Sequence, residues 1–191
     1  MKKFILVSIF FAFFSCNKVD LPKPNVIIIY ADDLGYGDVS SYGLGTLQTP
    51  NIDKIANDGI RFTNGYASSA TCSPSRYALM TGTYPWRNKN AKILTGANLI
   101  IDTTEMTLPK MFKSMGYQTG IVGKWHLGLG DGPVNHNEFI SPGPNEVGFD
   151  HSFIMADTQD RVPTVYIENG YVVNLDTKDP IEINFKGNDY G

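Results

Sequence analysis

Asn25-Val26-Ile27-Ile28-Ile29-Tyr30-Ala31 is an apolar, mainly β-branched run without alternating polar positions. Strands that are buried on both faces have this composition, and such strands are typical of parallel α/β sheets. The segment from Tyr117 to Val122 is predicted to be another buried strand. The fold class that we expect is α/β, with a mostly parallel central sheet flanked by helices.

Two carboxylates, Asp32 and Asp33, follow the first strand directly. Ligands of open α/β sheets bind at the carboxyl ends of strands, and gathered carboxylates suit a hard divalent cation. Adjacent strand residues point to opposite faces, so the chain must turn for both to reach one ion, and Gly35 and Gly37 permit a turn. A solvated strand-end turn is the alternative, because Asp and Gly are common turn residues.

Cys72 stands at the start of a predicted short helix that runs towards Gly82. Pro74 and Ser75 suit its first turn, and Arg76 lies about one turn beyond the cysteine. A positive helix end beside an arginine forms an electropositive pocket, which can hold an oxyanion or activate a thiol. A buried structural cysteine beside a capping turn is the alternative.

Lys124 and His126 follow the predicted strand that ends at Val122. Their i, i+2 spacing places both on one side of an extended chain. A cation beside an imidazole suits an anionic substrate and a proton transfer. A surface lysine and a packed histidine are the alternative.

Further elements are predicted from capping, alternation and turn signals. A helix from Thr49 to Asp58 would pack Ile52 and Ile55 on the sheet. Residues 130–147, rich in Gly, Pro and Asn, are expected to form a long surface loop with a solvated His136. The remaining expectations are a strand over 60–66, a helix from 107 to 116, a strand over 152–155, and a hairpin of 162–168 with 171–174.

The 191 residues are 42% hydrophobic and 18% charged, with a formal net charge of −3. These values describe an ordinary globular protein, and the absence of a basic cluster argues against nucleic-acid binding. Only two cysteines occur, Cys16 and Cys72. A disulfide between them would block the roles expected for both, so we reject it.

The amino terminus resembles a bacterial lipoprotein signal. Lys2 and Lys3 precede an apolar run from Phe4 to Phe14, which is too short to cross a bilayer. We expect residues 1–15 to be a signal peptide, Cys16 to be lipidated after cleavage, and 16–24 to be a tether. Phe13 departs from the Leu that is usual in such signals, and plain secretion is the alternative. The expected location is periplasmic or at the cell surface, on a bacterial membrane.

Two motifs carry a resemblance to a known family. Cys72-x-Pro-x-Arg, followed by Thr81 and Gly82, resembles the signature of the type I, formylglycine-dependent sulfatases. The segment Gly116 to His126 resembles the second signature of this arylsulfatase-like family, which belongs to the alkaline phosphatase superfamily. The resemblance extends from about residue 25 to about residue 174. Thr83 departs from the family pattern, which more often has Arg there.

The resemblance implies a sulfuric ester hydrolase that uses Ca²⁺, with Cys72 converted to formylglycine by a maturation enzyme. Asp32, Asp33 and residue 72 would bind the ion. Arg76 would hold the formylglycine hydrate, and Lys124 would contact both the hydrate and the sulfate.

The resemblance also implies the remaining roles. His126 would take a proton from the hydrate, and Thr158, by its offset from Gly148, would line the substrate pocket. Export would suit the cleavage of sulfated glycans outside the cytoplasm.

We expect this chain to be the N-terminal portion of the catalytic domain, over 25–191, and inactive alone. The family supplies further metal ligands and a leaving-group acid from later segments, and nothing after residue 174 matches them. Two alternatives remain open. One is a phosphodiester or phosphonate monoester hydrolase of the same superfamily, and the other is an inactive lipid-anchored remnant.

Overall fold

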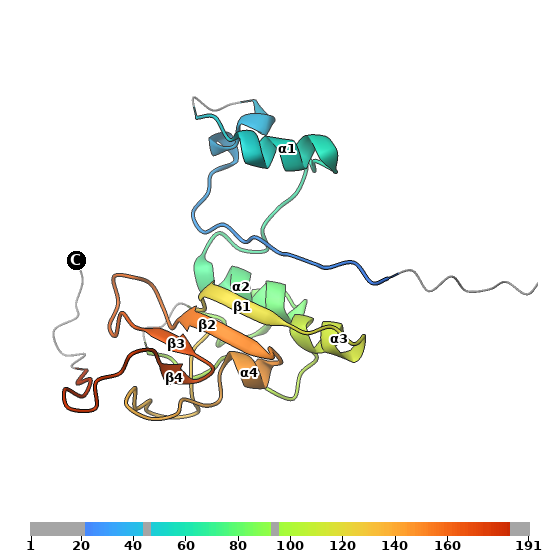
Figure 1. Cartoon of the computed structure of the whole chain (residues 1–191). Helices are drawn as coiled ribbons and strands as arrows, with labels where there is room; N and C mark the ends of the chain where they lie inside the picture. Colours follow the sequence, from blue (N-terminus) through green and yellow to red (C-terminus); the bar gives the residue numbers. More distant parts are fainter. Residues whose placement is uncertain (1–21, 44–46, 93–95, 184–191) are drawn as a thin grey trace, which may run out of the picture.

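Four strands form one mixed sheet in the computed structural model, which describes residues 22–43, 47–92 and 96–183 (Figure 1). β1 (Gly120–Lys124) pairs in parallel with β2 (His151–Met155). β3 (Tyr166–Glu168) pairs antiparallel with β2 and with β4 (Tyr171–Val172), so the order is β1-β2-β3-β4. The predicted strand over 152–155 and the predicted hairpin are confirmed, the hairpin with shorter strands.

Helices pack beside the sheet. α2 (Cys72–Thr81) contacts α3 (Leu108–Ser114), and α4 (Pro144–Val147) contacts β2 (Figure 1). The Thr107 hydroxyl caps α3 by accepting a hydrogen bond from the Lys110 N–H at 3.5 Å. Apolar side chains from these helices, the strands and the intervening loops form one core, which includes Tyr77, Met80, Trp125, Leu127, Val147, Ile154 and Ile167.

The extended segment from Asn25 to Ala31 is not the buried central strand that its composition predicts. It forms no β-ladder, and Ile27 and Ile29 are 84% and 82% exposed. Val26, Ile28 and Tyr30 instead line a cavity of about 410 Å³ together with residues of α2, α3 and β1. A central strand needs paired neighbours and a packed layer over each face. The part of the chain that the structure describes provides neither.

The helix predicted from Thr49 is confirmed as α1 (Pro50–Asp58), but its predicted packing is wrong. Ile52 and Ile55 are exposed, and α1 lies apart from the sheet with η1 (Tyr36–Asp38) and η2 (Ser40–Tyr42) (Figure 1). Polar contacts hold this region together, because the Ser40 hydroxyl donates to Asp53 Oδ2 at 2.5 Å. The strand predicted over 60–66 is also absent, and its apolar side chains are exposed.

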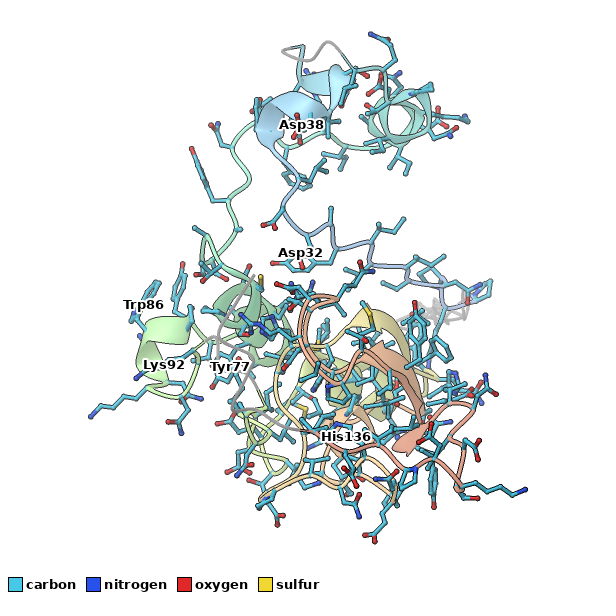
Figure 2. The ribbon with its side chains drawn as sticks, turned by 90° about the vertical axis from the view of Figure 1, so that its left-hand side faces the viewer. Asp32, Asp38, Tyr77, Trp86, Lys92 and His136 are labelled. Atoms are coloured by element: carbon cyan, nitrogen blue, oxygen red, sulfur yellow. The ribbon has the colours of Figure 1, made fainter. Side chains whose placement is uncertain are left out.

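Three further predictions need correction. The strand predicted over 117–122 runs instead from Gly120 to Lys124, and Val122 is 78% exposed because no described segment covers its face of the sheet. The helix predicted to end at Gly116 ends at Ser114. The loop over 130–147 contains α4 and covers the core, so His136 is buried rather than solvated (Figure 2).

Candidate active site

Three charged side chains meet at the carboxyl end of β1. Asp32 Oδ2 lies 2.5 Å from Lys124 Nζ and 3.1 Å from Arg76 Nη2. Arg76 also donates through Nη1 to the Lys124 carbonyl oxygen at 2.5 Å. Figure 2 shows Asp32 where the extended segment leaves the main body of the molecule. The structure therefore brings together three residues that the sequence motifs selected.

This cluster is partly shielded from water and carries a positive charge. The side chains of Arg76 and Lys124 are 13% and 16% exposed, and that of Asp32 is 32% exposed. The hydrogen bond from Lys124 lowers the pKa of Asp32, and the Arg76 charge lowers it further, against the opposing effect of burial. Asp32 is therefore ionised at neutral pH. Two cations facing one carboxylate leave an excess positive charge that favours an anion.

Cys72 is the first residue of α2, as predicted, and its thiol is free and half-buried. Pro74 fits the first turn because its missing N–H would have no helical partner there. Arg76 follows Cys72 by four residues and so lies on the same helix face. The helix ends at Thr81 and is capped by Gly82, whose φ of 65° lets its N–H donate to the Ala78 carbonyl at 2.8 Å.

Tyr30 and Ser75 support Arg76, although we predicted no site role for either. Their hydroxyl groups share a hydrogen bond. The Arg76 Cζ atom lies 5.7 Å from the centroid of the Tyr30 ring, which is a cation–π geometry. Tyr30 precedes Asp32 by two residues in an extended segment, so both point to the same side. The i, i+2 spacing of Tyr30 and Asp32 was the sequence signal that could have indicated a site role for Tyr30.

His126 is buried beside this cluster, with 2% of its surface exposed. Burial is the main cause that lowers the pKa of His126 to about 4, and the charges of Lys124, Arg161 and Arg76 add to the effect. The backbone N–H of His126 donates to the Ala156 carbonyl at 2.8 Å, which extends the pairing of β1 with β2. The imidazole is therefore neutral at pH 7 and able to accept a proton.

We expect the stability of the native-length protein to depend on His126 as the pH falls. The folded ring, with a pKa of about 4, stays neutral while the unfolded ring, with a pKa of 6.5, binds a proton. The free energy of unfolding therefore decreases as the pH falls from about 6.5 to about 4. Its slope against pH corresponds to the binding of up to about one proton on unfolding. Denaturant unfolding at several pH values in this range measures the free energy of unfolding, which should depend less steeply on pH in His126→Gln. Equal slopes for both proteins would contradict the low pKa.

Arg161 joins the site from the loop after β2. Its Nη1 atom lies 3.1 Å from His126 Nε2. We predicted no role for Arg161. β1 and β2 pair in parallel, so the loops that follow them emerge at the same edge of the sheet. The sequence around Arg161 or around His126 does not by itself indicate that the two loops are neighbours.

Asp33 and Thr158 lie outside the ion-pair cluster. The Asp33 side chain is exposed and pairs with no other described residue. The Thr158 Oγ1 atom is buried without a hydrogen-bond partner among the described residues.

The carboxylates were also predicted to bind a cation. Over residues 22–43, 47–92 and 96–183, no group of three or more His, Cys, Asp or Glu side chains is placed to hold a metal ion. Asp32 and Asp33 offer the hard oxygen donors that Ca²⁺ prefers, but two carboxylates are only part of its usual six to eight ligands. These donors fit Ca²⁺ in kind, and further ligands are needed.

The predicted signal peptide over 1–15 and the predicted lipidation site Cys16 lie outside the described residues. None of the helices in the described ranges has the length and apolar character that spanning a membrane requires.

The fold and the site together define an α/β protein with a cluster of charged side chains, which carries an excess of positive charge, at the carboxyl end of β1. The family model described as Sulfatase matches residues 24–181. The chain belongs to the sulfatase family. The predicted family and the predicted alkaline-phosphatase/sulfatase-like α/β fold are thereby confirmed.

Individual relatives agree with this assignment. The N-acetylgalactosamine-6-O-sulfatase of Bacteroides thetaiotaomicron is 53% identical over 172 residues, which are 89% of this chain and 34% of that protein. A solved structure from work on the metabolism of multiple glycosaminoglycans by this bacterium has a TM-score of 0.82 at 53% identity, over 86% of this chain and 35% of its own. Another, in complex with its substrate D-glucosamine-2-N,6-O-disulfate, has a TM-score of 0.51 at 33% identity, over 72% and 24%. The chain thus spans about a third of the first relative's length.

Proposed function

We propose that the protein, at its native length, hydrolyses sulfate monoesters of sulfated glycans. The observation that carries this proposal is the meeting of Asp32, Arg76 and Lys124 at the helix that begins with Cys72. A sulfate monoester is an unreactive anion, so a site must neutralise its oxygens while it presents a nucleophile. Two relatives support a sulfated amino sugar as the substrate class, since one is named for N-acetylgalactosamine 6-sulfate and the other binds a disulfated glucosamine.

We assign the nucleophile to Cys72 after a maturation enzyme has converted its thiol to formylglycine. The thiol suits this conversion because it is free, only half-buried and placed at a helix start. The hydrated aldehyde would attack the sulfur through one hydroxyl and later expel sulfate through the other, so no water needs to attack the sulfur. A serine hydroxyl lacks this second step.

The chain's own residues have distinct roles in this proposal. Arg76, held by Tyr30 and Asp32, positions the attacking oxygen and stabilises its negative charge. Lys124 contacts the sulfate that is transferred. His126 would accept the proton of the remaining hydroxyl through Nε2, so the contact of Arg161 with this nitrogen must open before the transfer. The Thr158 hydroxyl, buried without a partner among the described residues, supplies a donor in the substrate pocket.

Asp32 and Asp33 would hold part of the Ca²⁺ coordination sphere, together with residue 72. Asp32 is already ionised because its pKa is lowered, so no proton has to leave before it binds a cation. A bound divalent cation would supply neutralisation of the sulfate oxygens. The remaining ligands would come from further parts of the native-length protein.

We also propose export of the protein to the periplasm or the cell surface. Residues 1–15 would act as a signal peptide, a lipid on Cys16 would anchor the protein, and 16–24 would tether a catalytic domain whose first part is 25–191. Export would place the enzyme with extracellular glycans. Fractionation of the native cells tests this, and recovery of the mature protein from the cytoplasm would contradict it.

Peptide mass spectrometry of the native-length protein, purified from its own cell, tests the nucleophile. Conversion of the Cys72 thiol to an aldehyde should lower the mass of its peptide by about 18 Da, the difference between CH₂SH and CHO at an activated nucleophile. The unconverted protein from cells without the maturation enzyme is the control. An ordinary thiol at Cys72 in the native protein would refute the proposed nucleophile.

Relative rates test the class of ester. We expect faster hydrolysis of 4-nitrophenyl sulfate than of bis(4-nitrophenyl) phosphate, because Cys72, Arg76 and Lys124 match the sulfatase signatures. A clear preference for the phosphodiester would instead favour the related hydrolases of the same superfamily.

A further inference from the structure

Arg161 is a cation beside the site, and the proposed reaction assigns it no role. Its Nη1 atom lies 3.1 Å from His126 Nε2. None of the ion pairs among the described residues includes Arg161. The guanidinium is therefore held in place by a ring rather than neutralised by a carboxylate.

The contact with His126 leaves most of the guanidinium available. His126 is neutral, so its Nε2 accepts a hydrogen bond from Arg161 and the ring proton resides on Nδ1. A guanidinium carries five N–H donors in a planar fork, and this contact uses one of them. The backbone of Arg161 is also fixed, because its N–H donates to the Thr158 carbonyl at 3.2 Å.

The charges around His126 exceed what one sulfate can balance. Arg76 and Lys124 already share Asp32, and Arg161 adds a further cation from another loop. Asp157 and Asp160 lie in the same loop and attract Arg161, but neither carboxylate is within ion-pair distance of its guanidinium. A sulfate monoester brings a single negative charge, so Arg161 has capacity for another.

We propose that Arg161 binds a second anionic group of the substrate and thereby determines specificity among sulfated sugars. This inference rests on the proposed sulfatase function. The second group is a carboxylate or another sulfate, because both present two oxygens to which a guanidinium can donate in parallel. Such a contact is selective, since a sugar without the second anion leaves the cation unpaired.

The test compares sugars with the same scissile bond in a background that cannot turn them over. Calorimetry measures the Kd of three sugars for the native-length Cys72→Ala protein, with and without Arg161→Gln. The sugars are a 6-O-sulfated N-acetylhexosamine, the same sugar linked to a uronate, and the same sugar with a second sulfate. Arg87→Gln is the matched control, because Arg87 is an exposed arginine on η3 (Pro85–Arg87).

Arg161→Gln should raise the Kd of one or both two-anion sugars about 10- to 100-fold more than that of the one-anion sugar. Arg161→Lys should give a smaller effect, since it keeps the charge and loses the fork. If the Kd of the uronate-linked sugar rises, the second group is a carboxylate, and if the Kd of the disulfated sugar rises, it is a sulfate. Equal increases for all three sugars would overturn the inference, and so would no increase. Turnover of 4-nitrophenyl sulfate by the unmodified protein separately tests the sulfatase function.

Discussion

Cys72→Ser is expected to turn the native-length protein into a reagent that reacts once. The introduced hydroxyl can accept the sulfate, but it lacks the second hydroxyl that would expel it. One equivalent of alcohol should therefore be released, the protein should gain about 80 Da, the mass of SO₃, and steady turnover should fall by at least about 10³-fold. During incubation with 4-nitrophenyl sulfate, intact-protein mass spectrometry measures the mass gain, and the absorbance of released 4-nitrophenol measures the single equivalent and the steady turnover.

Cys72→Ala is the control for that experiment, because it removes the nucleophile without replacing it. This variant should show neither the mass gain nor the release of alcohol. Steady turnover by Cys72→Ser within about tenfold of the unmodified protein would show that water can release the sulfate, against the proposed role of the second hydroxyl.

Asp32→Asn should lower kcat/KM for a sulfate ester by about 10²- to 10⁴-fold in the native-length protein. The substitution preserves shape but removes the charge that pairs with Lys124 at 2.5 Å and with Arg76 at 3.1 Å. It also removes one proposed Ca²⁺ ligand, so the Ca²⁺ concentration that gives half-maximal activity should rise. Activity measured over a Ca²⁺ titration separates the two effects.

Asp58→Asn is a matched control for Asp32→Asn. Asp58 pairs with Lys54 at the same distance, 2.5 Å, but both side chains are largely exposed on α1. Exposed pairs contribute little to stability, so activity should stay within about twofold. If Asp32→Asn loses activity with an unchanged Ca²⁺ requirement, Asp32 acts through its ion pairs alone and the proposed metal role is wrong.

Local signals in the sequence predicted several elements of the fold. Thr107 indicated one helix start and caps it through its hydroxyl, whereas Thr49 makes no capping hydrogen bond and Pro50 at the first helical position marks the other start. Asn169-Gly170 indicated the hairpin turn because that turn needs positive φ angles, and both residues have them. The motif residues Asp32, Arg76 and Lys124 were predicted to act together, and the structure places them in contact.

Other features depended on which segments become neighbours. The run from Asn25 to Ala31 indicated burial, yet in the described structure it pairs with no strand, because the partners that a central strand needs must come from elsewhere in a chain. Ile52 and Ile55 likewise have the spacing of a buried helix face, but α1 meets no sheet.

Only the tertiary structure placed Arg161 against His126 and Tyr30 beneath Arg76. The sequence by itself determined the helix starts, the turn and the residue types of the site, because these follow from backbone hydrogen bonds and φ angles within a few residues. Strand order and burial join residues far apart in the chain. They follow from packing between distant segments, which no local pattern specifies.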